Sequence, residues 1–174
     1  KRNNLYANSG IVVEINVHQD IPKYDHFGAL KGLEYQKNLE KLAFTAGGRT
    51  QTAPAQRLTD FVDGKLSNTL NDCSYQPGLK SAPLHSLLPK IIGGRLRTGL
   101  KEFGKKMNGY YTEEANVIGV ESRTSSPVSI PRKENLEHTE IEGLYPCGEG
   151  GGYAGGIVSA AMDGERCAEA AIKE

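Results

Sequence analysis

The feature that most restricts the fold of this chain is a glycine-rich stretch near its C-terminal end. Residues 148–156 contain six glycines, a short apolar run precedes them at 144–147, and a segment of helical period follows at 157–172. Strand, glycine turn and helix in this order suit phosphate binding, because glycines let the backbone approach a ligand and a helix N-terminus attracts an anion. A plain glycine-rich turn that packs a helix onto a sheet is the alternative.

The pattern of this stretch also excludes one common motif. A literal Gly-x-Gly-x-x-Gly is present at Gly150, Gly152 and Gly155. The fingerprint that opens a Rossmann fold needs a βαβ unit and an acidic residue about 20 positions later, on a second strand. No second strand follows here, so we do not assign that fingerprint. The expected helix has one apolar face made by Ile157, Ala161, Gly164, Ala168 and Ile172.

Composition narrows the functional classes. The 21 basic residues equal the 21 acidic ones, which gives no electrostatic reason to bind nucleic acid. No apolar run of about 18 residues is present, so we expect no membrane span. Three cysteines without metal-ligand spacing indicate a reduced, cytoplasmic protein with no metal site. The chain begins at Lys1, without Met, and we expect it to be a fragment of a larger protein.

The remaining periodicity predicts a mixed fold. Helices are expected at 33–46, with a left-handed stop at Gly47–Gly48, and at 90–107. Strands are expected at 10–17, 116–120, 128–130 and 144–147, and 133–142 reads as a loop or hairpin. Residues 50–63 suit either a short strand followed by a helical turn or an extended piece. The fold class is therefore α+β or α/β.

Four segments carry a resemblance to a known family. They are residues 7–13 (Ala-Asn-Ser-Gly-Ile-Val-Val), 53–57 (Ala-Pro-Ala-Gln-Arg) with Asp60-Phe61, 119–128 (Gly-Val-Glu-Ser-Arg-Thr-Ser-Ser-Pro-Val) and 143–150 (Gly-Leu-Tyr-Pro-Cys-Gly-Glu-Gly). Together they resemble bacterial FAD-dependent dehydrogenases of the glutathione-reductase-like, two-dinucleotide-fold superfamily. The resemblance covers essentially the whole chain. It departs at Gly151, which is often Ala in that family, and at Ser129, which is often Arg.

The resemblance implies a division of the chain. Residues 1–18 are a strand segment leading from the FAD domain, 19–125 an inserted substrate-side α+β domain, and 126–174 the strand-helix return to a Rossmann-like FAD domain. The N-terminal FAD domain would be absent, so the FAD site would be incomplete. The implied activity is that of an oxidoreductase with FAD as cofactor, NAD(P)H as electron donor and an unknown small-molecule substrate. A non-catalytic flavin-fold binding or interaction module is the alternative.

The resemblance also assigns FAD contacts to the glycine-rich stretch. Glu149 would accept hydrogen bonds from ribityl hydroxyls, where relatives more often carry Asp. The backbone N–H groups of Gly155, Gly156 and Ile157 would stabilise negative charge on the reduced flavin, and positive φ is expected at Gly155 or Gly156. The full set of expected cofactor residues is Gly148, Glu149, Gly150, Gly151, Gly152, Tyr153, Ala154, Gly155, Gly156 and Ile157.

The turn after residue 120 provides the expected substrate side. Glu121 and Arg123 are the expected catalytic groups, because a guanidinium can pair with an anionic substrate through two hydrogen bonds. The hydroxyls of Ser122, Thr124 and Ser125 would bind substrate. A local Glu–Arg salt bridge with Ser/Thr turn capping is the alternative. For Cys147, a buried structural thiol is favoured over a redox one.

Overall fold

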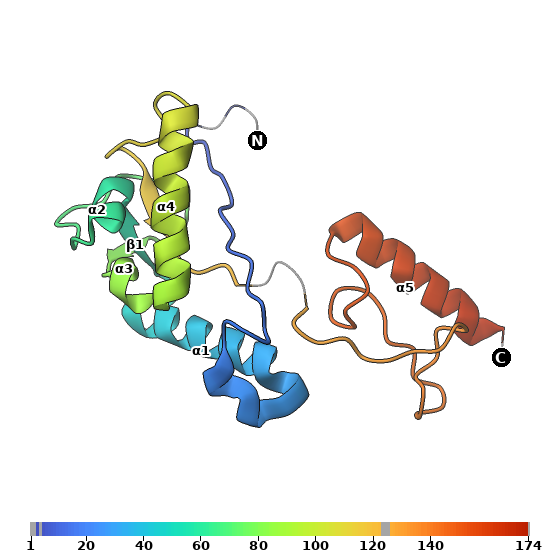
Figure 1. The fold of residues 1–174 in the computed structure, drawn as a ribbon. Coiled ribbons are helices and arrows are strands. Elements are labelled where there is room, and N and C mark those ends of the chain that lie inside the picture. The colour runs from blue at the N-terminus through green and yellow to red at the C-terminus, as the bar shows by residue number, and fades with distance from the viewer. Residues whose placement is uncertain (1–2, 4, 123–125, 174) are drawn as a thin grey trace. The chain divides into compact units, whose positions relative to one another are not determined.

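The computed structural model describes residues 3, 5–122 and 126–173, and it separates into two compact units. One unit comprises residues 1–20 and 37–120, and the other comprises 21–36 and 121–174. Mixed helices and strands confirm the α+β class (Figure 1). In chain order the elements are η1 (Pro22–Leu30), α1 (Lys31–Ala46), β1 (Ala53–Arg57), α2 (Leu58–Asp63), β2 (Leu79–Ser81), α3 (Leu84–Leu87), α4 (Lys90–Lys106), β3 (Asn116–Ile118) and α5 (Ile157–Ile172).

A small mixed sheet organises the first unit. Its order is β2-β1-β3, with β1 parallel to β2 and antiparallel to β3. Ala53 pairs with Leu79 on one side of β1, and Arg57 pairs with Asn116 on the other. Residues 50–63 thus follow the first of the two alternatives, a strand and then a short helix.

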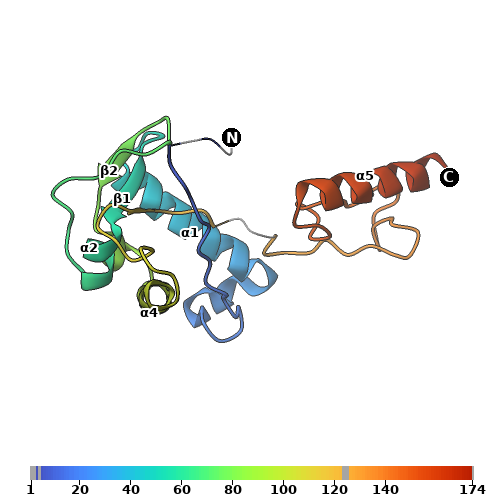
Figure 2. The ribbon, with the colours of Figure 1, turned by 90° about the horizontal axis from the view of Figure 1, so that it is seen from above.

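Apolar side chains from the short helices cover this sheet. Phe61 and Val62 of α2 and Leu84 of α3 are fully buried, and Leu100 of α4 is 4% exposed. They form one cluster, and α4 packs against both α2 and α3. Figure 2 shows α2 beside α4. Gly64 ends α2 at φ +74°, in the left-handed conformation that glycine adopts without steric cost. The core of this unit therefore lies between the sheet and α4.

A buried amide is satisfied within this core. Gln56 of β1 is fully buried, and its Nε2 donates to the Lys65 carbonyl at 2.5 Å. Its Oε1 accepts from the His85 backbone N–H at 2.9 Å. Pairing both ends of the amide avoids the desolvation penalty of an unpaired polar group.

The two longest helices expected in the first part of the chain are confirmed. α1 and α4 match the expected ranges to within two residues at each end. Gly48 follows α1 at φ +96°, which confirms the left-handed stop. A Cβ at Gly47 would collide with the Thr52 carbonyl oxygen, so the chain also needs glycine there for close approach.

Three expected strands are wrong. Within the described part of the chain, no strand ladder forms at residues 10–17, 128–130 or 144–147. The fourth expected strand, 116–120, is present in part, because residues 116–118 form β3. Residues 11–17 keep an alternation of half-buried and exposed positions. A strand needs a neighbour to receive its backbone hydrogen bonds, and these segments have no strand beside them among the described residues.

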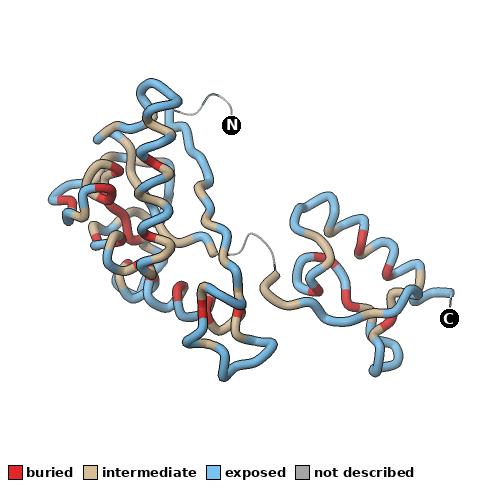
Figure 3. The backbone as a smooth tube through the Cα atoms, viewed as in Figure 1, coloured by how far each residue is buried: buried red, intermediate tan, exposed pale blue. Residues whose placement is uncertain are grey.

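The second unit has little regular structure apart from its helices. Tyr24 of η1 packs edge-on against Tyr35 of α1 at a centroid distance of 5.4 Å. Residues 133–142 form a loop without a strand, and one isolated bridge joins Arg132 to His138, so the segment follows the loop alternative more closely than the hairpin. α5 has the expected bounds, and Figure 3 shows most of its surface exposed. No helix in residues 3, 5–122 or 126–173 has the length and apolar character to cross a bilayer.

Candidate functional site

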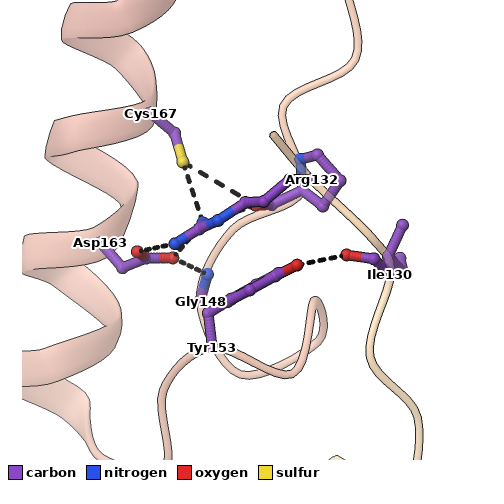
Figure 4. Close-up of polar contacts among 7 residues, drawn as sticks. Ile130, Arg132, Gly148, Tyr153, Asp163 and Cys167 are labelled. Carbon is purple, nitrogen blue, oxygen red and sulfur yellow. Dashed lines mark hydrogen bonds and ion pairs between the residues drawn. The ribbon is translucent and has the colours of Figure 1, made fainter. Parts of the chain in front are cut away.

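An ion pair joins a loop of the second unit to α5. Arg132 Nη1 donates to Asp163 Oδ2 at 2.9 Å, and Nη2 donates to Oδ1 at 2.8 Å (Figure 4). The two side chains are 12% and 11% exposed. Two parallel charge-assisted bonds fix both the distance and the orientation of the guanidinium.

The same pair holds the start of the glycine-rich turn. The Gly148 N–H donates to Asp163 Oδ2 at 2.9 Å, and Arg132 Nη1 donates to the Pro146 carbonyl at 2.9 Å. The hydrogen bond from Arg132, followed by that from Gly148, lowers the pKa of the Asp163 carboxyl. The hydrogen bond to Asp163 in turn raises the pKa of Arg132. Both groups are thus held in their charged forms, and the turn is tied to α5.

Internal hydrogen bonds and one aromatic contact complete the turn. The Gly152 N–H donates to the Glu149 carbonyl and the Tyr153 N–H to the Gly148 carbonyl, both at 3.0 Å. The Tyr153 hydroxyl donates to the Ile130 carbonyl at 2.7 Å, and the centroid of its ring lies 3.6 Å from Arg132 Cζ. This cation–π contact joins the far end of the turn to the ion pair.

Glycine is required at Gly152. Its φ is +85°, and a Cβ there would lie 2.7 Å from the Val128 carbonyl oxygen. Gly148 also has positive φ, at +65°. By contrast, a Cβ on Gly150 would meet no other atom within 4 Å. The left-handed residues therefore lie at the ends of the turn.

The helix that follows begins at the surface. Ile157 and Val158 are 92% and 72% exposed, and N–H groups in the first turn of a helix have no intrahelical partner. Gly156 has φ −146°, so the expected positive φ is wrong for Gly156, because extended backbone joins the turn to the helix. The Gly156 N–H donates to Ser159 Oγ at 3.1 Å. Ser159 thereby occupies one of the three backbone donors expected to face a flavin.

The structure brings the expected cofactor residues into one local element. Gly148 and Gly151 are buried in it, Tyr153 and Ala154 are half-buried, and the rest are exposed: Glu149, Gly150, Gly152, Gly155, Gly156 and Ile157. The exposed Glu149 carboxylate and the exposed helix start are groups that fit a ligand rich in hydroxyls and phosphates.

Of the expected substrate-side residues, the structure describes Glu121 and Ser122. Glu121 is exposed and, among the described residues, makes no hydrogen bond or ion pair with the turn. Ser122 is half-buried, and its carbonyl accepts from Gln36 Nε2 of α1 at 2.9 Å. The remaining expected residues, Arg123, Thr124 and Ser125, lie outside the described residues.

The cysteines differ from expectation. Cys147 is exposed, so the expected burial of its thiol is wrong, and Cys167 of α5 is the buried one at 3% exposure. The apolar run at 144–147 was expected to end in a buried position, and the buried residue of this run is Pro146. No group of three or more potential metal ligands occurs in the described ranges.

Sequence reasoning missed Arg132, Asp163 and Cys167. Asp163 carried a usable signal, because Asp is a poor helix former and here interrupts a run of small residues. An acid at such a position indicates a specific partner. Arg132 carried none, since it lies in a loop 31 positions before Asp163.

Comparison with known proteins places the chain in a family. Residues 1–124 match the family described as "FAD-dependent protein, C-terminal domain-like". The chain is also 39% identical over 170 residues to an uncharacterized protein of Clostridium beijerinckii, covering 97% of this chain and 31% of that protein. The chain thus spans about a third of the length of that relative. It belongs to the FAD-dependent protein, C-terminal domain-like family.

Proposed function

We propose that this member of an FAD-dependent family is the C-terminal part of a flavoprotein oxidoreductase of the glutathione-reductase-like superfamily. The observation that carries the proposal is the glycine-rich turn, held by Arg132 and Asp163 beside an exposed helix N-terminus. The parent protein uses NAD(P)H as electron donor and acts on a small-molecule substrate. Bound FAD supplies the redox chemistry, and this chain supplies position and electrostatics.

The division of the parent follows the sequence expectation. Residues 1–18 lead out of an N-terminal FAD domain, 19–125 are inserted on the substrate side, and 126–174 return to the FAD domain. Two observations support this division. Residues 10–17 and 144–147 have strand-like sequence without a strand partner among the described residues. Ile157 and Ile172, on the apolar face of α5, are 92% and 85% exposed, and this face packs on the sheet of the absent domain.

The chain's own residues contact FAD at two points. Glu149 accepts hydrogen bonds from ribityl hydroxyls, because its carboxylate is exposed beside the buried Gly148. The backbone N–H groups of Gly155 and Ile157 face the negative end of the flavin, and the helix dipole of α5 adds to their effect. Glu121 and Arg123 serve the substrate, and Ser122, Thr124 and Ser125 orient it.

Glu149→Ala in the parent protein tests the cofactor contact. Removing the acceptor leaves ribityl hydroxyls unpaired, a loss of about 1–3 kcal/mol, or about 5- to 150-fold weaker FAD binding. The measurement is the FAD dissociation constant by fluorescence titration. Glu142→Ala, which removes another exposed carboxylate of the same unit, is the matched control and retains wild-type affinity. Equal affinity in both variants would remove Glu149 from the site.

The activity has a separate test. The parent, loaded with FAD, is yellow and is bleached by NADH or NADPH under anaerobic conditions. A parent that binds FAD but is bleached by neither nicotinamide would favour a non-catalytic flavin-binding module. A parent that stays colourless after refolding with FAD would contradict the flavoprotein assignment.

The 174-residue chain alone binds FAD at millimolar affinity or weaker. A helix N-terminus contributes about 0.3–1 kcal/mol to an exposed anion. One acceptor adds about 0.5–1.5 kcal/mol. Association itself costs about 4 kcal/mol or more. Calorimetric titration measures the constant, and a micromolar value would show that these residues form a complete site.

A further inference from the structure

Two cysteines that are 20 positions apart in the sequence meet at the base of the glycine-rich turn. Cys167 Sγ lies 3.8 Å from the Pro146 carbonyl oxygen, which belongs to the peptide group leading into Cys147 (Figure 4). Arg132 Nη1 lies 2.9 Å from that oxygen and 3.4 Å from Cys167 Sγ. The neighbouring Cys147 also contributes, as a minor cause after burial, to the raised pKa of the Cys167 thiol. The fold therefore makes a thiol pair from residues whose spacing shows none.

We propose that Cys147 and Cys167 form a reversible intramolecular disulfide when the protein meets a low-molecular-weight disulfide such as glutathione disulfide. Cys147 is exposed and Cys167 is 3% exposed, so the two thiols have different access to solvent. This inference concerns the chain's own thiols and does not depend on flavin binding.

The difference in solvent exposure between the two thiols indicates the order of the exchange steps. The Cys147 thiolate attacks one sulfur of the small disulfide and releases one equivalent of small thiolate, which leaves a mixed disulfide on Cys147. The Cys167 thiolate then attacks the Cys147 sulfur and releases the second equivalent. The protein thiols are oxidised by two electrons, and the small disulfide is reduced to two thiols after each leaving thiolate takes up a proton.

The environment of Cys167 suits the second step. Burial raises the pKa of the Cys167 thiol and so lowers its thiolate fraction. The buried sulfur therefore does not react first with reagents in solution. The neighbouring Arg132 guanidinium acts in the opposite direction and favours the thiolate. Arg132 is itself held by Asp163, so the positive charge stays beside the sulfur during the exchange.

Oxidation would close a loop that contains the whole glycine-rich turn. The bond would join residue 147 to the face of α5 that also carries Asp163, one helical turn earlier. The turn would then be attached to α5 covalently as well as through the Gly148 N–H. Oxidation is therefore expected to slow hydrogen exchange in residues 148–153.

The test uses the purified chain equilibrated with mixtures of reduced and oxidised glutathione, quenched with acid and alkylated. Intact mass counts the remaining thiols, and peptide mapping identifies the bond. Cys73→Ser is the matched control, because Cys73 belongs to the other unit and is half-buried. Cys167→Ser isolates the first step at the exposed cysteine.

The wild type and Cys73→Ser are expected to form the 147–167 bond, with little glutathione adduct at equilibrium. Cys167→Ser is expected to accumulate glutathione on Cys147, because no second thiol displaces it. A stable Cys147–glutathione adduct in the wild type, or a disulfide that includes Cys73, would overturn the proposal. Absence of any disulfide in the wild type, under conditions that modify Cys147 in Cys167→Ser, would also overturn it.

Discussion

Replacing Arg132 with alanine is the perturbation that best isolates what holds the glycine-rich turn. The change removes both hydrogen bonds to Asp163 and the bond to the Pro146 carbonyl. It also removes the cation that lies 3.6 Å from the Tyr153 ring. Asp163 keeps the Gly148 N–H as a partner but loses its counter-ion.

The structure sets the size of the effect. Breaking a buried ion pair by removing one partner costs about 3–5 kcal/mol, and the residual 11% exposure of the Asp163 side chain favours the lower end. A change of about 3 kcal/mol in the local opening free energy corresponds to roughly 150-fold faster hydrogen exchange. We expect this acceleration at the Gly148 amide and in residues 148–153.

Native-state hydrogen exchange, followed by NMR or by mass spectrometry of peptides, measures this change. Arg166→Ala is the matched control, because Arg166 is an exposed arginine one position before Cys167 on the same helix. Exposed substitutions of this kind change stability by less than about 0.5 kcal/mol. Exchange at Gly148 that is equally slow in both variants would refute the claim that Arg132 holds the turn.

Three further outcomes follow from the same geometry. The pKa of Asp163 is lowered in the folded protein, so its charged form stabilises the fold above the unfolded-state pKa of about 3.9, and this stabilisation is lost as pH falls through the folded pKa. The Gly148 amide resonance should therefore titrate below about pH 4 in the wild type. Asp163→Asn should abolish that titration. Gly152→Ala should destabilise the second unit by more than about 1–2 kcal/mol in urea denaturation, because strain at φ +85° adds to the clash with Val128. Gly150→Ala should change the same transition little, since its Cβ has open space; similar losses in both variants would contradict this explanation.

The helices were predictable from the sequence because their signals are local. α5 spans Ile157–Ile172 as its period indicates, and α1 stops where glycine at φ +96° follows it. Strand propensity is clear at 10–17, which is rich in β-branched residues, but a strand also requires a partner. Because no strand lies beside this segment among the described residues, β-branched sequence alone did not produce a sheet there.

The candidate site was predictable only where it is continuous in the chain. Residues 148–157 form one element, as the run of glycines indicates. The groups that hold it come from separate segments, Arg132 from a loop and Asp163 from α5. The helical period of α5 identified its apolar face, which does not include Asp163. Such pairings depend on how the loop returns to the helix, and neither periodicity nor spacing specifies that return.

The assignment of the glycine-rich turn to FAD is tested most directly by hydrogen exchange in the parent protein with and without the cofactor. The account predicts that saturating FAD slows exchange in peptides covering residues 148–157, with the largest change around Glu149 and at Gly155 and Ile157. Peptides of α2, which lies in the core of the other unit, serve as the internal reference. A parent that holds FAD stoichiometrically while residues 148–157 exchange at an unchanged rate would contradict the account.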